Sequence, residues 1–283
     1  MSDGQRGETT DEHVRDWWST EIIEMEPGVI RYRGYPIEQL IGNVSFAQTV
    51  WLLLRGDLPS PAEARLLDAV LMSAVDHGPQ APSIAIARMA ATCGVGLNNA
   101  IASAVNVLGD VHGGAGEQAV ELYLAVDRER GAGAPLRDAV AKALDEVFAS
   151  GQALVPGFGH RFHPRDPRAP RLLELVDEAA AAGTVSGRFA TIGRQVEREI
   201  ETRKGRRIPM NIDGATAVVY AELGFPPGLA RGLFCLSRSV GILAHAWEQT
   251  RQGGRNKGPI PRDMIWTYNG PEVRPLPEVE SDA

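Results

Sequence analysis

The chain has 283 residues, of which 43% are hydrophobic and 23% charged, as in globular proteins that form one large or two smaller domains. Its 36 acidic residues outnumber 29 lysines and arginines, and the net charge of -7 lacks the positive field of a protein that coats nucleic acid. Two cysteines cannot build a disulfide framework, and there is no Cys-x-x-Cys motif. We expect a cytoplasmic protein without a membrane span, because the N-terminus lacks a signal-peptide run and no stretch reaches about 18 apolar residues.

The first strong helical pattern covers residues 46–55, between the N-cap residue Ser45 and a stop at Gly56. The residues expected on its buried side are Phe46, Val50, Leu53 and Leu54. The next helix start combines a capping box from Ser60 to Glu63 with proline at the first helical position. The stripe expected to be buried behind it is Leu66, Leu67, Val70, Leu71 and Ala74.

Further helical patterns follow, some of them rich in the small residues that suit closely packed central helices. They cover residues 84–93, 98–108, 117–128, 136–150, 171–182, 187–204, 214–223 and 228–250. The best strand signal is the short VIRYRGY at 29–35. The sequence therefore predicts an all-α fold.

Two segments break the helical pattern and concentrate basic residues. Residues 151–170 carry four prolines, three glycines, three arginines and two histidines, and residues 251–262 carry four arginines or lysines and no acid. Binding and catalytic residues are often found in such loops. The polar, acidic tails at 1–18 and 272–283 are expected to be poorly ordered.

Two of the six histidines have glycine neighbours that allow a ligand to approach the backbone closely. His112 lies in GDVHGGAG and His160 in PGFGHRFH, and the two together are more informative than a single histidine, which is usually a surface or satisfied core residue. No metal site is expected, because there is no His-x-x-x-His on a helix and the spacing from His160 to His163 has no fixed geometry in a proline-rich loop.

Three charged residues each allow two interpretations. Asp213 precedes the predicted helix at 214–223, as either a helix N-cap or a functional carboxylate. Arg168 either caps a helix or faces solvent, or it binds an anion. Arg238 has apolar neighbours on nearly every side, and a buried guanidinium requires an anionic partner, which is an internal acid or a bound carboxylate.

Five motifs, in order, resemble signature segments of citrate synthases. GVIRYRGYPIEQL is similar to the opening Y-R-G-Y-P-I-E segment of that family, and VHGGAGEQA to its H-G-G-A-N-E-A segment. VPGFGHRFHPRDPRA is similar to the G-F-G-H-R loop that ends in D-P-R-A, MNIDG to P-N-V-D, and LSRSVGILAHAWEQ to L-A-R-T-V-G-W-I-A-H-W-x-E. The matches cover residues 28–262, so the chain is identified as a member of the citrate synthase superfamily.

Two features separate the chain from typical citrate synthases. The helical block between LRGDLPS and the helix before His77 is shorter than in that family. The segment DHGPQAPS around His77 resembles the D-H-G-P of citryl-CoA lyases, including the C-terminal module of ATP-citrate lyase, more than the D-H-E-x-N-A-S of citrate synthases. The closer resemblance is therefore to the compact citryl-CoA lyase branch.

The resemblance implies that the chain makes or breaks a carbon–carbon bond between an acyl-CoA enolate and a 2-keto acid. It assigns Asp213 as the base for the C–H beside the thioester, His112 as donor to the thioester oxygen, and His160 as the group that polarises the keto oxygen. His77, which lies 35 residues before His112, would help to bind the keto-acid or citryl group. The arginines implied to bind carboxylates are Arg168, Arg238 and Arg262.

The resemblance also implies a CoA thioester as substrate, with no permanently bound cofactor and no metal. CoA would lie along a loop where glycine and proline allow backbone contacts to the adenine, formed by Pro156, Gly157, Phe158 and Gly159. The implied architecture is a large helical domain, 1–113 with 225–283, beside a small helical domain, 114–224. The substrates would bind in the cleft between them, and domain closure would exclude water.

The family places an arginine of the neighbouring subunit in an A-R-P-R-like motif, which implies an obligate homodimer. In this chain GPIPRD puts Ile260 at the more similar position, so either Arg255 or Arg262 replaces that arginine or one carboxylate contact is missing, which leaves the identity of the keto acid open.

Three functions remain open at this point. The first is a citryl-CoA lyase, which cleaves citryl-CoA to acetyl-CoA and oxaloacetate, and the second is a small citrate or 2-methylcitrate synthase. The third is a catalytically silent CoA- or carboxylate-binding protein. The joint presence of His112, His160 and Asp213 favours an enzyme, because a binding protein needs no general base.

Overall fold

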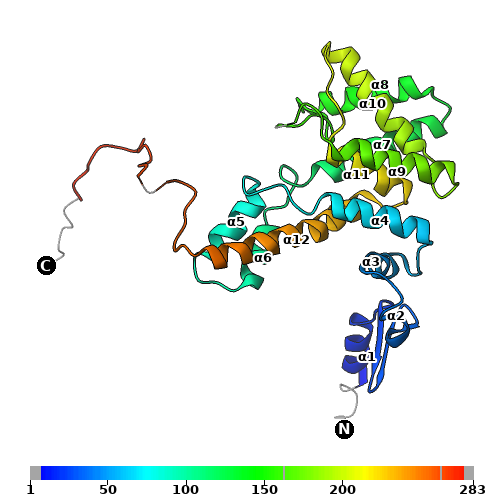
Figure 1. Cartoon of the computed structure of the whole chain (residues 1–283), viewed down its shortest axis with the longest axis horizontal. Helices are drawn as coiled ribbons and strands as arrows, with labels where there is room; N and C mark the ends of the chain where they lie inside the picture. Colours follow the sequence, from blue (N-terminus) through cyan, green and yellow to red (C-terminus); the bar gives the residue numbers. More distant parts are fainter. Residues whose placement is uncertain (1–7, 162, 262, 277–283) are drawn as a thin grey trace, which may run out of the picture.

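The computed structural model describes residues 8–161, 163–261 and 263–276, and within these ranges the chain forms twelve helices and one small sheet (Figure 1). The helices are α1 (Glu8–Trp17), α2 (Ile37–Leu40), α3 (Phe46–Arg55), α4 (Pro61–Ser73), α5 (Pro82–Ala91), α6 (Leu97–Val105), α7 (Ala115–Gly131), α8 (Leu136–Ala149), α9 (Arg168–Ala181), α10 (Arg188–Lys204), α11 (Ile212–Glu222) and α12 (Pro227–Gln252). The antiparallel strands, in the order β1-β2-β3, are β1 (Ile23–Glu26), β2 (Val29–Tyr32) and β3 (Tyr35–Pro36). The predicted all-α class is confirmed. In the described part of the chain, no helix is both long and apolar enough to cross a membrane.

The long helix α12 runs from α5 and α6 to the other group of helices (Figure 1), and it contributes to two apolar cores. Its first half contributes Ala230 and Leu233 to the larger core, which is otherwise built by α3, α4, α7–α11 and the segments that connect them. Its second half contributes Ile242 and Ala246 to a smaller core with α5 and α6. One rigid element therefore fixes both groups of helices, and any side chain in the middle of α12 lies where the two groups meet. The division into domains 1–113 with 225–283 and 114–224 stays a prediction.

The predicted caps of α3 and α4 are confirmed. Ser45 and Ser60 each accept a hydrogen bond from the backbone of the third helical residue, and Gln48 and Glu63 return the bond, which completes both capping boxes. Gly56 ends α3 in the left-handed conformation at φ 92°. Each such cap contributes about 1 kcal/mol.

The buried face of α3 differs from the expected one. Val50 is buried as expected, but Phe46 is 72% and Leu54 39% exposed, and Trp51 is buried instead. The Trp51 ring packs edge-on against Phe225, with ring centroids 5.3 Å apart. This aromatic contact with the larger core sets the rotation of α3, and the periodicity of a single helix cannot reveal it.

The N-terminal expectation was wrong for residues 8–17, which form α1 rather than a poorly ordered tail. Strand β1 was also not expected, because its four residues, IEME, give a weak strand signal and only Ile23 is partly buried. β1 is a strand because its backbone pairs with β2, from Ile23 opposite Tyr32 to Glu26 opposite Val29. This pairing cannot be predicted from the residue pattern of β1 alone.

The irregular segment 151–170 is held against the start of α11 by two glycines. Gly157 lies at φ 86°, and a Cβ atom on Gly214 would lie 2.4 Å from the Gly157 carbonyl oxygen. The backbone N–H of Asn211 donates to that same oxygen at 3.0 Å, and the N–H of Gly159 donates to the Pro209 carbonyl at 2.8 Å. The loop that carries His160 and the helix that carries Asp213 are therefore fixed to each other.

Replacing Gly214 by alanine should lower the free energy of unfolding by about 1–3 kcal/mol, because an added methyl group has no room between these backbones. The measurement is urea unfolding followed by circular dichroism. Gly228→Ala is the matched control, since a Cβ there meets no atom within 4 Å, and it should cost nothing. Equal stability of both variants would show that the glycine contact does not hold the loop.

Candidate active site

Arg238, in the middle of α12, is the buried cation around which the other predicted residues gather. Its side chain is only 5% exposed, its Nε donates to the Ala74 carbonyl at 3.1 Å, and its guanidinium lies 4.9 Å from the centre of the Phe234 ring. Burial lowers the pKa of Arg238, while the negative charge of Asp213 opposes this shift. Among the described residues, the hydrogen-bond partner of Arg238 is thus a carbonyl rather than an acid, and the binding of an anion by its terminal nitrogens stays a prediction.

Asp213 lies in the first turn of α11, but it is not the N-cap. Asn211 takes that place, because its Oδ1 accepts the backbone N–H groups of Asp213 at 2.9 Å and of Gly214 at 3.2 Å. The structure therefore rules out the capping interpretation of Asp213. Its carboxylate accepts no hydrogen bond from any described residue. Burial raises the pKa of Asp213, and the positive charges of Arg238 and Arg168 limit this rise. Such a carboxyl group is suited to accept or return a proton.

His112 is held in one tautomer by the start of α5. The backbone N–H of Ser83 donates to His112 Nε2 at 3.2 Å, and the Ser83 hydroxyl lies 3.0 Å from the same nitrogen. Because a backbone N–H can only donate, Nε2 is the acceptor and the proton of the ring is on Nδ1. Burial, and secondarily Arg238, lower the pKa of His112. His112 is therefore a neutral donor through Nδ1.

The turn that presents His112 requires glycine. Gly113 lies at φ 103°, and a Cβ atom there would lie 2.9 Å from the Phe234 ring. Phe234 also stacks on Arg238, so this one ring separates the histidine turn from the arginine.

His77 and His160 lie side by side, with ring centroids 5.4 Å apart and the rings at 71°. The backbone N–H of His163 donates to His160 Nδ1 at 3.0 Å, so Nδ1 is an acceptor and the proton of the neutral ring is on Nε2. Burial lowers the pKa of both His77 and His160. The charge of Arg168 lowers both further, whereas Asp166 raises both.

Asp166 is a buried residue that the sequence reasoning did not single out. Its side chain is fully buried, and it accepts Arg168 Nε at 3.0 Å, Arg168 Nη2 at 2.9 Å and the backbone N–H of Ile212 at 3.1 Å. Burial acts to raise the pKa of Asp166, but these hydrogen bonds outweigh it and hold the pKa below its ordinary value. Its position two residues before Arg168, at the start of α9, was the available signal.

The Asp166 contact limits what Arg168 can do. One edge of the guanidinium is paired with Asp166, and Nη1 reaches the Ser73 carbonyl at 3.4 Å. The predicted carboxylate contact of Arg168 stays a prediction, and only the Nη atoms at the outer edge of the guanidinium are placed to make it.

The predicted CoA loop presents backbone rather than side chains. Phe158 is 6% exposed, with its side chain in the larger core and its backbone paired with Met210. Pro156 is partly exposed, and Gly157 and Gly159 both have positive φ angles. The CoA contacts of Pro156, Gly157, Phe158 and Gly159 stay a prediction, and for Phe158 only the backbone could make them.

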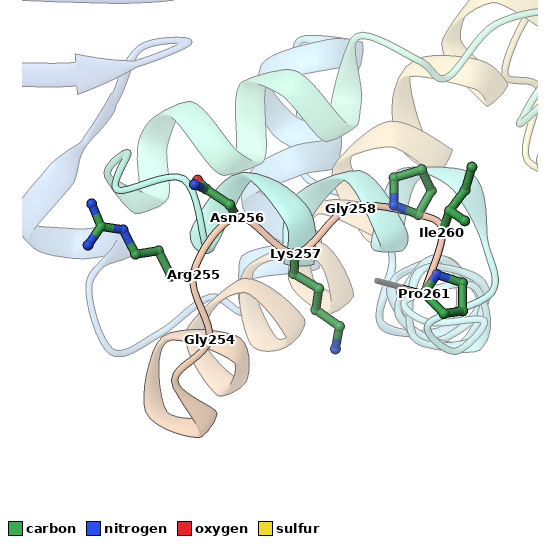
Figure 2. A pocket seen from close by; sticks show the side chains of 8 residues that line it. Gly254, Arg255, Asn256, Lys257, Gly258, Ile260 and Pro261 are labelled. Carbon is green, nitrogen blue, oxygen red and sulfur yellow. The ribbon is translucent and has the colours of Figure 1, made fainter. Parts of the chain in front are cut away.

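The basic segment after α12 lies far from the cluster in its own chain. From Arg238 to Gln252 the helix rises by roughly 21 Å. Beyond it, the N–H groups of Asn256 and Lys257 bond the carbonyl and the hydroxyl of Thr92, at 3.1 and 3.0 Å. Figure 2 shows the hollow lined by this segment, with Arg255 and Lys257 pointing in different directions. The other predicted carboxylate ligand of this region, Arg262, lies outside the described residues.

The expected absence of a metal site stays a prediction. Across the residues that the structure describes, no three His, Cys, Asp or Glu side chains lie together as metal ligands would.

Three comparisons with known proteins bear on this cluster. The family described as citrate synthase, C-terminal domain, matches residues 14–65 and 59–262. A solved structure of citryl-CoA lyase from Hydrogenobacter thermophilus is 32% identical, with a TM-score of 0.78 over 91% of this chain and 97% of that one. ATP citrate lyase from Methanothrix soehngenii shares the fold at 22% identity and a TM-score of 0.76, over 94% of this chain and 45% of that one. The chain belongs to the citrate synthase family.

The curated relatives are longer than this chain. A citrate synthase of Acidithiobacillus ferridurans is 30% identical over 259 residues, which are 88% of this chain and 64% of that protein. The glyoxysomal citrate synthase of Cucurbita maxima is 27% identical, over 84% of this chain and 46% of its own length. The chain thus spans about half to two thirds of these two relatives.

The lowered pKa of His112 should make the free energy of unfolding depend on pH. The folded ring resists protonation, whereas the unfolded chain takes up the proton near the ordinary pKa of 6.5, so the free energy of unfolding falls as the pH drops below that value. His112 can contribute at most about 1.4 kcal/mol per pH unit to this decrease in the free energy of unfolding. The variant His112→Asn should lack that contribution. Urea unfolding of both proteins between about pH 5 and pH 8 measures it. Parallel pH curves would mean that Ser83 does not hold the ring neutral.

Proposed function

We propose that the chain is a citryl-CoA lyase, which cleaves citryl-CoA to acetyl-CoA and oxaloacetate. The observation that carries the proposal is a pair of groups near buried Arg238. His112 is a neutral donor through Nδ1, and Asp213 has a carboxyl group that does not serve as the helix N-cap; the charge of Arg238 acts to lower the pKa of both. An enolate oxygen needs such a donor, and the adjoining carbon needs a group that exchanges a proton. The 32% identity and the TM-score of 0.78 to the Hydrogenobacter lyase support this reaction direction.

The cleavage step balances with these residues. His160 takes the hydroxyl proton of citryl-CoA, the carbon–carbon bond breaks, and its electron pair passes to the thioester as the enolate of acetyl-CoA. His112 donates to the enolate oxygen, and Asp213 in its protonated form returns a proton to the carbon. The raised pKa of Asp213 favours that form. To take the hydroxyl proton, His160 must have an unprotonated Nε2. The ring proton is then on Nδ1, so the His163 N–H contact at Nδ1 has to give way during this step.

The carboxylates and the thioester would be held by the surrounding groups. Arg238 and the outer edge of Arg168 bind carboxylates, and His77 binds the keto-acid or citryl group beside His160. The backbone from Pro156 to Gly159 binds CoA. A small citrate or 2-methylcitrate synthase is the second candidate, because the named relatives include citrate synthases and the bond-making residues are the same.

One experiment separates the candidates. Incubation with citryl-CoA, and separately with acetyl-CoA plus oxaloacetate, is followed by assays for free thiol and for oxaloacetate. A lyase releases oxaloacetate from citryl-CoA without free thiol, whereas a synthase liberates thiol by hydrolysing the citryl thioester. A silent binding protein does neither, and that result would refute the enzyme.

Asp213→Asn should reduce the carbon–carbon bond chemistry by about 10²–10⁴-fold, because the amide keeps the shape but cannot exchange the proton. The affinity for CoA, measured by calorimetry, is the control and should stay within a few-fold of the parent. Near-parental turnover would remove Asp213 from the mechanism.

We further propose that the active form is a homodimer. Four residues of α12 form an exposed apolar stripe at spacings of four, three and four, namely Leu236, Val240, Leu243 and Trp247. A continuous apolar face of this kind on a long helix is typical of a subunit interface. The C-terminal segment runs away from the body of the molecule, with exposed Met264, Ile265, Trp266 and Tyr268 (Figure 1). A second copy would cover both features.

In such a dimer Arg255 or Arg262 would reach the partner's site, because α12 ends at Gln252, roughly 21 Å along the helix from Arg238 of its own chain, and Arg255 lies beyond that end. Mixed dimers test this, by combining an Asp213→Asn chain with a chain that carries Arg255→Ala and Arg262→Ala. If the arginines act across the interface, one site of each mixed dimer has both defects and the other has none, so activity returns on mixing.

The controls are the two parent variants measured alone. If the arginines act within their own chain, every site keeps one defect and mixing restores nothing. Full activity of the double arginine variant by itself would show that neither arginine takes part in catalysis and that the segment is only a solvated basic loop.

A further inference from the structure

The turn that carries His77 is fastened to α12 at three successive points on one face of the helix. Arg238, Gly241 and His245 are spaced by three and four residues, so they lie above one another along the helix. Arg238 donates to the Ala74 carbonyl, and a Cβ atom on Gly241 would lie 2.1 Å from the Val75 carbonyl oxygen. The third contact joins His245 Nε2 to Asp76 Oδ1 at 3.2 Å. The backbone before His77 therefore runs directly along α12.

The Asp76 carboxylate contacts groups on both sides of the His77 turn. One oxygen contacts His245, and the other accepts the backbone N–H of Gly78 at 3.2 Å. His77 lies between these two attachments, and Gly78 turns the chain at φ 75°. The orientation of His77 thus depends on where the carboxylate is held.

Arg88 of α5 fixes the direction of the His245 contact. Its Nη1 lies 3.0 Å from His245 Nδ1, and because a guanidinium can only donate, Nδ1 accepts and the proton of the ring is on Nε2. His245 therefore donates to Asp76. Arg88 is itself held by Glu248 at 2.5 Å and Gln252 at 2.6 Å. The order of donation runs from Arg88 through His245 to Asp76.

We infer that His245 and Asp76 form a positioning pair that sets His77 for the citryl or keto-acid group; this rests on the proposed function. The His245 side chain is 19% exposed and that of Asp76 43%, and an ion pair with a partner this exposed to water contributes little to stability, so we assign the contact to the orientation of the turn. Neither residue needs to touch the substrate. Arg88 extends the same control to α5, whose first turn holds His112 through Ser83.

The test compares His245→Ala and Asp76→Asn with the parent on citryl-CoA. Each should lower kcat/KM by about 10- to 100-fold, mainly through KM, because a displaced binding group loses its geometry. His245→Gln, which retains a donor that reaches Asp76, should recover most of the loss. His13→Ala, an exposed histidine on α1, is the matched control and should match the parent.

A double-mutant cycle separates positioning from general destabilisation. In a His77→Ala background, His245→Ala should change kcat/KM by less than about twofold, since the residue through which it acts is gone. A loss as large as in the parent background would overturn the inference. Thermal midpoints of all variants show that each is folded under the assay conditions.

A second measurement needs no turnover and so separates this inference from the proposed function. In protein labelled with ¹³C at the histidine ring, His77→Ala assigns the His77 signal. His245→Ala and Asp76→Asn should shift that signal, and His13→Ala should leave it in place. If neither substitution shifts it, the positioning role is wrong, whatever reaction the protein catalyses.

Discussion

The buried guanidinium of Arg238 is the constraint on which the site depends. A cation held at 5% exposure is costly unless its donors are satisfied, and here one donor takes the Ala74 carbonyl while the ring of Phe234 covers one face. Its charge opposes the rise in the pKa of Asp213 and adds to the fall in the pKa of His77 and His112. One residue thus influences the protonation of three groups from different elements.

The position of Arg238 on α12 explains how it can do this. The helix contributes to both apolar cores, so its middle lies between the two groups of helices. From there the charge of Arg238 acts on Asp213 of α11, on His112 and on His77. Each of these is then fixed locally, by Asn211 capping α11, by Ser83 bonding His112 and by Asp166 pairing with Arg168. The rigid scaffold provides placement, and the local hydrogen bonds provide orientation.

The two arginines illustrate different relations between stability and binding. Arg168 is paired with a fully buried carboxylate that also accepts the first N–H of α11, so much of its donor capacity serves the fold. Arg238 has no such ion pair among the described residues, and its nearest acids act on it only through charge. Of the two, Arg238 is the better equipped to receive the carboxylate of a small molecule.

The sequence by itself determined the helical class, the caps at Ser45 and Ser60 and the motif residues, because periodicity, capping and short motifs are local properties of the chain. It could not decide between two interpretations of Asp213, since that depended on whether Asn211 took the cap. The tautomer of His112, the pairing of Asp166 and the attachment of Asp76 to His245 also came only from the tertiary structure. In each case a hydrogen bond joins groups that are far apart in the sequence. Such a bond does not change the spacing of apolar residues in either element, so the sequence pattern cannot reveal it.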